Sequence, residues 1–369
     1  MWWLTIPVII YAMIIFLMWM TLVRWRGYDL PVPETPPSVS VIVAARNEEK
    51  HIEKLLKSLV GQDYPAHLVE AVIVNDNSTD RTPIVVSEFI EKQKDHSPFM
   101  IRLINNPFTG KKRALRYGIE KSAGEVILVT DADCITGRGW IGSHASLYGE
   151  GQADMVVAEV NQRPVGGFAS LFGVLEFSAL QSITEAAVVA RHPVMCNGAN
   201  MSFRRDVYSR HSGELHDSLP SGDDMFLLHA VVRGGGRVMY AGGSAAAVET
   251  ASAVTAAALL RQRARWASKA FAYTYAPTLF LAAATAACNA AVTAAAVASV
   301  ISADHLPLLG TLYAVRLVPD YLITARNIKK GKEHFPVLPF LLSEILYPFW
   351  FCLVAVVSLF PSSRRFRGR

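Results

Sequence analysis

The chain is poor in cysteine and in charge for its length. Its four cysteines stand far apart in a sequence of 369 residues, so neither the paired spacing of a zinc site nor the density of a small disulfide-stabilised fold is present. A reducing compartment is therefore expected. Charged residues make up 18% of the chain, and an excess of 36 Lys and Arg over 31 Asp and Glu is too small for a nucleic-acid-binding surface. We expect no nucleic-acid partner.

Two nucleotide-binding fingerprints are absent as well. No G-x-x-x-x-G-K-[ST] segment occurs in the chain, and the first expected strand-to-helix turn contains no glycine. P-loop NTPases and dinucleotide-dependent dehydrogenases are thereby excluded.

Apolar residues, by contrast, make up 51% of the chain, which excludes intrinsic disorder. Residues 2–23 carry no charge and are long enough to cross a bilayer as a helix. Arg24 and Arg26 follow directly. The start of the chain lacks the cationic region and cleavage site of a signal peptide, so we expect a retained anchor with the following residues in the cytoplasm.

Three further apolar segments are expected to be membrane helices near the end of the chain. The second of them carries Arg316 and Asp320 four residues apart, where the two charges could neutralise each other. The third holds Glu344 and is interrupted by prolines, which predicts either a kinked span or a re-entrant pair. Three spans would leave the basic tail outside, against the positive-inside rule, so the number of spans stays open. The segments are residues 277–303, 306–325 and 335–363.

Between the membrane segments, short apolar strand patterns alternate with helical ones. This order predicts right-handed crossovers and an α/β, Rossmann-like domain whose mainly parallel sheet is covered by helices on both faces. Strands are expected at residues 39–45, 71–74, 101–104 and 126–130, and helices at residues 48–59, 82–92 and 111–121. The whole chain then divides into an anchor, a linker, the α/β domain, an interfacial helix, membrane helices and a basic tail, at residues 1–26, 27–37, 38–250, 251–275, 276–363 and 364–369.

Polar residues gather where the expected strands end, which is where parallel sheets bind ligands. Arg46 and Glu48 follow the first strand, and Asp76 follows the second. Asp131 and Asp133 follow the fourth strand and point to the same side of the sheet. Two close carboxylates favour Mg²⁺ or Mn²⁺ shared with substrate phosphates; the alternative is that they only cap the following turn.

Three other polar segments have a functional and a structural interpretation each. Lys111 and Lys112 begin a helix, where they would either bind a diphosphate or belong to a helix end that is exposed to solvent. Asp80 is expected to form an Asx-turn or helix cap. Asp223 and Asp224 open an apolar helix, where capping explains one acid and the second could have a raised pKa suited to a general base. The segment 261–266 is either a basic interfacial helix or part of the site.

Taken in order, these segments resemble the membrane-anchored family 2 glycosyltransferases of GT-A fold, which include cellulose, chitin and hyaluronan synthases. The resemblance covers about residues 38–270. Residues 74–80 look like the family's V-D-D-G-S-x-D, from which Asn75 and Asn77 depart, and residues 110–115 look like its G-K-x-x-A-L. Asp131-Ala132-Asp133 is similar to its D-x-D, and residues 262–266 fit Q-x-x-R-W, which is associated with processive synthases.

The resemblance implies an inverting transfer of a sugar from a nucleotide-sugar donor to a glycan or lipid-linked acceptor, at the cytoplasmic face of the plasma (inner) membrane. Asp224 takes the role of general base, and Asp223 stands where the family has glutamate. Asp133 with Asp131 would hold Mg²⁺ or Mn²⁺. The implied donor contacts are Ala44, Arg46, Glu48, Asp76, Lys111 and Asp131, and the implied acceptor or diphosphate contacts are Asp223, Gln262, Arg265 and Trp266, whose indole would stack on a sugar ring.

Other functions remain open at this point. A membrane nucleotidyl or phosphoryl transferase would share the acidic site and the lysines, but it has no use for Trp266. An inactive glycan-binding or export subunit would not need the acidic residues. Within the transferases, a distributive enzyme adding one sugar to a lipid carrier is the alternative to a polymer synthase. Few spans follow the α/β domain, so a homo-oligomer or an export partner is expected for a polymer.

Overall fold

The computed structural model describes residues 1–25, 27, 32–94, 99–215, 219, 222–330 and 334–360. They form two compact units. The α/β unit contains the described residues of 27–161 and 195–251, and the helical unit contains those of 1–25, 162–194 and 252–360. The α/β domain expected as one stretch, 38–250, is thus interrupted, because residues 162–194 pack with the apolar helices instead.

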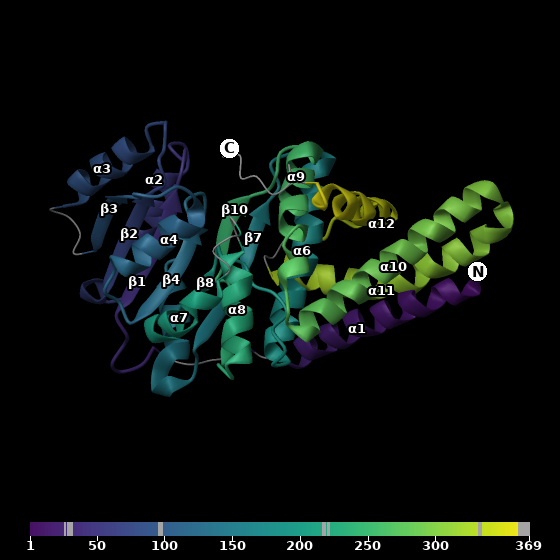
Figure 1. The fold of residues 1–369 in the computed structure, drawn as a ribbon, viewed down its shortest axis with the longest axis horizontal. Helices are drawn as coiled ribbons and strands as arrows, with labels where there is room; N and C mark the ends of the chain where they lie inside the picture. Colours follow the sequence, from purple (N-terminus) through teal and green to yellow (C-terminus); the bar gives the residue numbers. More distant parts are fainter. Residues whose placement is uncertain are drawn as a thin grey trace. The chain divides into compact units, whose positions relative to one another are not determined.

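A seven-stranded sheet in the order β3-β2-β1-β4-β8-β6-β9 forms the centre of the α/β unit (Figure 1). The first four strands of the chain are parallel, as predicted, and β8 runs antiparallel to β4 and β6. Six of the seven residues of β1 are buried, which is typical of a parallel strand covered on both faces. The strands are β1 Val39–Ala45, β2 Val69–Asn75, β3 Met100–Asn105, β4 Val126–Asp131, β6 Met155–Ala158, β8 Met201–Arg204 and β9 Val238–Ala241. A second sheet has the order β5-β10-β7, with bounds Ile135–Thr136, Val248–Ala251 and Val160–Arg163.

Helix α4 lies directly against β1 and β2 because it has a glycine where it touches them. A Cβ on Gly118 would lie 2.7 Å from a methyl carbon of Ile42 and 2.8 Å from one of Val74. Helix α2 begins later than the predicted residue 48, since residues 46–51 form the turn after β1. The α/β unit contains α2 Ile52–Val60, α3 Thr82–Gln93, α4 Lys111–Glu120, α5 Trp140–Ala145, α7 Arg205–His211 and α8 Asp223–Arg233, with short 3₁₀ turns at Ala66–Leu68, Ser146–Gly151 and Ser212–Glu214.

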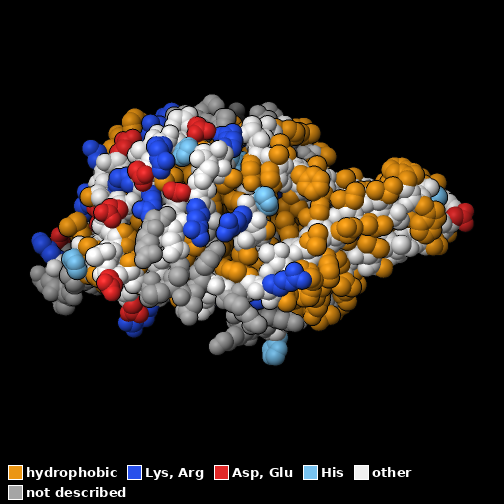
Figure 2. Space-filling model, turned by 90° about the horizontal axis from the view of Figure 1, so that it is seen from below, with side chains coloured by type: hydrophobic (Ala, Val, Ile, Leu, Met, Phe, Trp, Pro, Cys, Tyr) orange, Lys and Arg blue, Asp and Glu red, His pale blue; other side chains and the backbone are white. Residues whose placement is uncertain are grey.

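The helical unit holds five helices that, within the described ranges, are long and apolar enough to cross a membrane. Helices α1, α10 and α11 run alongside one another (Figure 1), and Figure 2 shows hydrophobic side chains over most of their visible surface. The five are α1 Thr5–Arg24, α6 Gly167–Val189, α10 Ala276–Ile301, α11 Leu306–Lys330 and α12 Val337–Ser358. The unit also contains α9 Ala256–Ala267 and 3₁₀ turns at Trp2–Leu4, Ala270–Ala272 and Ala303–His305.

Helix α6 was not expected, and it differs from the other four. Its most apolar stretch is 72% buried, whereas those of the other four are 22–33% buried. Protein rather than lipid therefore covers most of its apolar surface.

The C-terminal segments confirm one expectation and correct another. Arg316 Nε lies 3.0 Å from Asp320 Oδ2, as the four-residue spacing predicted, and 3.3 Å from Glu344 Oε2. The re-entrant pair is wrong for the described residues, because α12 is one continuous helix with Pro348 inside it. The basic tail 364–369 lies outside the described residues.

Candidate active site

The carboxyl ends of four parallel strands meet at one edge of the sheet. Asn75 of β2 is level with Ala45 of β1 and with Asn105 of β3, while Ala44 of β1 is level with Asp131 of β4. This register brings the implied donor residues that follow β1, β2 and β4 to the same edge. The Nε atom of Arg46 is buried there without a hydrogen-bond partner in the described structure, so it can serve an acceptor atom of a ligand.

The turns after β1 and β2 hold each other through reciprocal hydrogen bonds. Asn47, whose φ of 58° is left-handed, accepts at Oδ1 from the Thr79 N–H at 2.8 Å. The Glu48 N–H donates to Thr82 Oγ1 at 2.7 Å. Asp80 Oδ1 accepts from the Thr82 N–H at 2.9 Å, which confirms the predicted Asx-turn. Burial acts to raise the pKa of Asp80, but the hydrogen bonds from Thr82 and the Glu49 N–H outweigh it and hold the pKa below its ordinary value.

Asp76 has a structural role that the sequence did not indicate. Asp76 is 2% exposed. Its Oδ1 accepts from Asn106 Nδ2 at 2.8 Å and from the Gly110 N–H at 2.9 Å. Gly110 has a φ of 108° and precedes the first residue of α4. Asp76 therefore fixes the start of α4, and its implied contact with a base stays a prediction.

The first two side chains of α4 connect the sheet edge to the start of α8. Lys111 Nζ contacts Asp131 Oδ1 at the end of β4. Lys112 Nζ contacts the Leu215 carbonyl and lies 3.5 Å from Asp223 Oδ1. The Lys112 side chain is only 11% exposed, so the interpretation as a solvated helix end is wrong for this residue. Both acidic pairs thus have a lysine of α4 as partner.

Asp223 and Asp224 are the first two residues of α8. Gly222, with a φ of 107°, precedes the helix and has no side chain to cap it. Asp224 Oδ1 instead accepts from the Met225 N–H in the first turn, which agrees with the predicted capping by one of the two acids. Burial raises the pKa of Asp223 to about 6; the Lys112 charge opposes this and the Asp224 charge adds to it. Asp224 accepts from the Gly198 N–H at 3.1 Å and from the Met225 N–H at 2.9 Å.

The sequence reasoning missed the loop before β8 that fixes Asp224. A Cβ on Gly198 would lie 3.4 Å from Asp224 Cβ and Oδ2, so a residue without a side chain lets the loop backbone reach this carboxylate. Asn197 Oδ1 accepts from the Ala199 N–H at 3.0 Å and supports the turn. The Asn197-Gly198 dipeptide is a turn signal that could have drawn attention to this loop.

The pair Asp131 and Asp133 fits a divalent cation that is shared with a substrate. Burial raises the pKa of the neighbouring Cys134 thiol, and the negative charges of both carboxylates add to this, so both lie near the same point. No group of three or more His, Cys, Asp or Glu side chains suited to a metal occurs in the part of the chain that the structure describes. A cation would therefore need phosphate oxygens besides the two carboxylates, which is how Mg²⁺ is commonly held.

The residues of the Q-x-x-R-W segment lie on α9 in the helical unit. Thr255 precedes this helix, and its hydroxyl accepts from the Ala258 N–H at 3.2 Å. Gln262, Arg265 and Trp266 are all partly buried. The Trp266 ring has the Arg263 guanidinium over it, 4.3 Å from the ring centroid, and the Phe177 ring of α6 at 6.1 Å.

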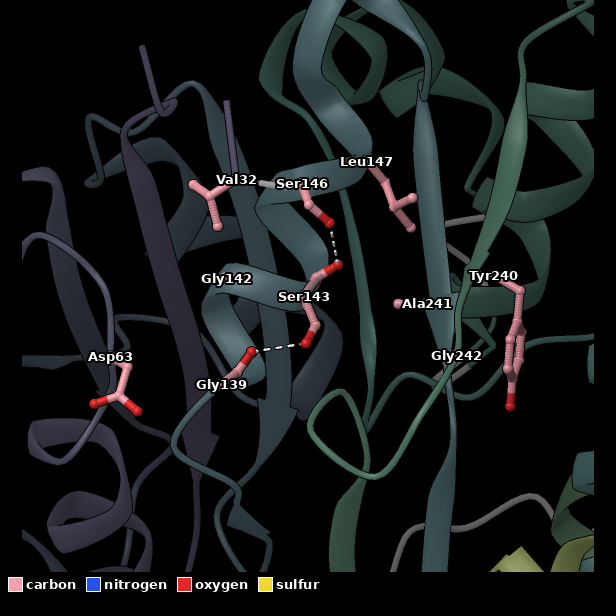
Figure 3. Close-up of a pocket in the computed structure, with 10 residues that line it drawn as sticks. All are labelled: Val32, Asp63, Gly139, Gly142, Ser143, Ser146, Leu147, Tyr240, Ala241 and Gly242. Carbon is pink, nitrogen blue, oxygen red and sulfur yellow. Dashed lines mark hydrogen bonds between the residues drawn. The ribbon is translucent and has the colours of Figure 1, made fainter. Parts of the chain in front are cut away.

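A cavity of about 290 Å³ in the α/β unit contains none of the predicted site residues (Figure 3). Its two serines use their hydroxyls locally: Ser143 donates to the Gly139 carbonyl at 2.8 Å and Ser146 to the Ser143 carbonyl at 3.1 Å. The lining residues are Val32, Asp63, Gly139, Gly142, Ser143, Ser146, Leu147, Tyr240, Ala241 and Gly242.

Comparison with solved structures defines the fold class. The mannosyltransferase PcManGT from Pyrobaculum calidifontis, solved in complex with GDP-Man and Mn²⁺, matches with a TM-score of 0.61 and 22% sequence identity, over 90% of this chain and 98% of that one. The shared fold is GT-A. The family models then give the family: "Glycosyl transferase family group 2" matches residues 126–360, and "Glycosyl transferase family 2" matches residues 40–211. The chain belongs to glycosyltransferase family 2.

Curated relatives match shorter segments. The probable glycosyltransferase YdaM of Bacillus subtilis is 45% identical over 97 residues, which are 26% of this chain and 23% of that protein. The beta-monoglucosyldiacylglycerol synthase of Nostoc sp. is 39% identical over 110 residues, which are 30% of this chain and 23% of that protein. In both cases the match spans less than a quarter of the relative's length.

Proposed function

We propose that this chain is a metal-dependent, inverting glycosyltransferase that moves a sugar from a nucleotide-sugar donor to a hydroxyl of a glycan or lipid-linked acceptor. The observation that carries the proposal is the pair of contacts from α4. Lys111 contacts Asp131 on the donor side, and Lys112 lies 3.5 Å from Asp223 on the acceptor side. The first two residues of α4 would thereby contact both the donor diphosphate and Asp223, which is adjacent to the base Asp224.

The donor diphosphate would lie at the amino end of α4, where exposed N–H groups and Lys111 offer positive charge. Arg46 Nε would donate a further hydrogen bond from the turn after β1. Mg²⁺ or Mn²⁺ on Asp131 and Asp133 would neutralise charge on the departing diphosphate. On donor binding, Lys111 would leave Asp131 and contact the diphosphate, and the ion would take the place of Lys111 at Asp131.

Asp224 would accept the proton of the acceptor hydroxyl, while the hydroxyl oxygen forms the new bond to the anomeric carbon and the nucleoside diphosphate leaves from the opposite face. The configuration inverts, because the sugar undergoes one displacement. The Gly198 and Met225 N–H groups fix the orientation of the Asp224 carboxylate. One base and no enzyme nucleophile suffice, unlike the paired carboxylates of retaining hydrolases.

The helical unit supports transfer at a membrane, and we infer that the α/β unit faces the cytoplasm of a multi-pass inner-membrane protein. A lipid-linked acceptor suits an enzyme that carries such apolar helices, because the lipid part of the acceptor stays in the bilayer. The name of the Nostoc relative, a beta-monoglucosyldiacylglycerol synthase, supports an acceptor of this kind. The second candidate is therefore distributive transfer of a single sugar to a lipid; Q-x-x-R-W instead favours a polymer, which would require an oligomer or an export partner.

The test is nucleotide release by the detergent-purified protein from a panel of nucleotide sugars, with and without a lipid acceptor. We expect release from one donor, dependence on Mg²⁺ or Mn²⁺, and loss of turnover in Asp133→Asn with the protein still folded. Full turnover in excess chelator would contradict the metal role. No release from any donor would contradict the proposal itself.

A further inference from the structure

The Q-x-x-R-W motif leaves its second residue unspecified, and in this chain that residue is Arg263. Its side chain is 4% exposed, although arginine is rarely buried without a partner. The partner is Glu176 of α6, whose Oε2 lies 2.8 Å from Arg263 Nε; the Glu176 side chain is itself only 10% exposed. This is a buried, charge-assisted pair between two helices of the same unit.

The rest of the guanidinium contacts two residues of the motif. Arg263 Nη1 donates to Gln262 Oε1 at 2.8 Å. The guanidinium lies 4.3 Å from the centroid of the Trp266 ring, within the range of a cation–π contact, and 5.7 Å from that of Phe177. One planar group thus holds the Gln262 amide by its oxygen and covers the Trp266 indole.

A glycine of α6 allows α9, the helix that carries Arg263, to pack closely against it. A Cβ on Gly173 would lie 3.1 Å from a methyl carbon of Leu259 on α9, so glycine lets the two helices approach closely. The Gly173 carbonyl also accepts a long hydrogen bond of 3.5 Å from Arg263 Nη2. Gly173, Glu176 and Phe177 therefore form one face of α6 against which the motif helix is set.

We propose that Arg263 is a positioning residue for Gln262 and Trp266, and that Glu176 holds Arg263 in place. The inference rests on the proposed function and on the acceptor or diphosphate contacts that the family resemblance implies for the motif. With its oxygen bound to Arg263, Gln262 presents its NH₂ group to a ligand. With the guanidinium over the Trp266 ring, a sugar stacks only on the part of the indole that Arg263 leaves uncovered. Lysine cannot replace Arg263, because an ammonium lacks the planar fork that reaches Glu176 and Gln262 together.

The test compares Arg263→Lys with Arg261→Lys, since Arg261 is exposed on the same helix and lies outside the five-residue Q-x-x-R-W motif. For Arg263→Lys we expect a loss of about 10- to 100-fold in kcat/KM for the acceptor, because misplaced groups cost roughly that much. Donor affinity measured without acceptor should change less than about twofold if the donor diphosphate is held at α4. Arg261→Lys should match the parent protein. Unchanged acceptor kinetics in Arg263→Lys would overturn the proposal.

Two further variants separate positioning from mere stability. Glu176→Gln combined with Arg263→Gln removes both buried charges together, so the protein should fold without an uncompensated charge. If Arg263 only stabilised the fold, this double variant would regain acceptor kinetics; we expect the loss to persist. Combining Arg263→Lys with Trp266→Phe should cost less than the product of the two separate effects, because the residues act together.

A readout independent of turnover distinguishes this proposal from the proposed function. The emission difference between the parent protein and Trp266→Phe isolates the Trp266 indole from the other six tryptophans. We expect Arg263→Lys, but not Arg261→Lys, to shift this difference spectrum even if no donor is turned over. Absence of a shift overturns the positioning, whereas a shift without any nucleotide release leaves the positioning intact and overturns the transferase function.

Discussion

At the scale of single residues, the adjacent acids Asp223 and Asp224 differ in their surroundings. Asp224 is oriented by two backbone N–H groups, one of them from the loop before β8. Asp223 instead faces Lys112. We predict that Asp224→Asn lowers kcat by about 10²–10⁴-fold, the usual contribution of a general base, and leaves donor binding measurable. Single-turnover transfer and donor titration on the same preparation check this.

The matched control variant is Asp223→Asn, which replaces the carboxylate next to Asp224 with an amide of nearly the same shape. It should weaken transfer less than Asp224→Asn does. An inactive Asp223→Asn beside a nearly normal Asp224→Asn would show that the two roles are exchanged.

Asp223 should also make stability depend on pH. Burial raises its pKa from an ordinary value of 3.8 to about 6, against the opposing charges of Lys112 and Lys111 and together with that of Asp224. Between about pH 4 and pH 6 the folded protein keeps a proton that the unfolded chain has lost. The retained proton stabilises the folded state. Its contribution to the free energy of unfolding is fully present below pH 4, is lost as the pH rises through 6, and amounts to roughly 3 kcal/mol at most.

Asp223→Asn removes this titration. Urea unfolding of the parent protein and of the variant between pH 4 and pH 7.5 should give a difference in stability that changes up to pH 6 and is constant above it. A difference independent of pH would contradict the raised pKa.

At the scale of helices, a buried cluster in the helical unit joins four apolar helices. Arg316 of α11 is 1% exposed and lies between Asp320 and Glu344 of α12. Tyr11 of α1 donates to Asp320 Oδ1 at 2.8 Å, and Asn289 Oδ1 of α10 accepts from Arg316 at 3.3 Å. Arg316→Leu would leave two buried carboxylates without their cation, so we predict a loss of about 3–5 kcal/mol in stability.

Replacing Arg316, Asp320 and Glu344 together by leucine should recover much of that loss, since no uncompensated charge remains. Thermal unfolding of the detergent-purified variants checks this, with Asp304→Asn at the exposed helix connection as control. A triple variant as unstable as Arg316→Leu would show that the cluster acts through shape rather than through charge.

This cluster also shows what the sequence could and could not predict. Arg316 and Asp320 were predicted as partners because they are four residues apart on one helix. Glu344 comes from another helix, and no local spacing connects it to Arg316. In the same way, the first four strands and the acidic pair after β4 followed from periodicity, whereas the contacts of Lys112 with Asp223 and of Gly198 with Asp224 join segments that only the tertiary fold brings together.

At the scale of the whole chain, α6 raises the question of how many helices cross the bilayer. Along the sequence, α6 lies between β6 and β8, and these two strands pair with each other in one sheet. A spanning α6 would require residues 190–200 to return through the hydrocarbon as irregular chain, where unsatisfied N–H and C=O groups are not tolerated. Sequence reasoning placed residues 162–194 within the α/β domain, because Glu, Gln, Ser and Thr residues lower the hydropathy of α6 and conceal its likeness to the other four apolar helices.

We therefore predict that both ends of α6 lie on the cytoplasmic side and that the connection between α10 and α11 lies outside. Single cysteines would be placed at Val165 before α6, at His192 after it and at Asp304 in the connection, all three exposed positions, in a chain whose four native cysteines are replaced. A membrane-impermeant maleimide should label Asp304→Cys in intact cells. Val165→Cys and His192→Cys should react only after permeabilisation, as should Lys54→Cys on the exposed surface of α2. Labelling of Val165→Cys and His192→Cys from opposite sides would show that α6 crosses the membrane, and the sheet could then not hold β6 and β8 side by side.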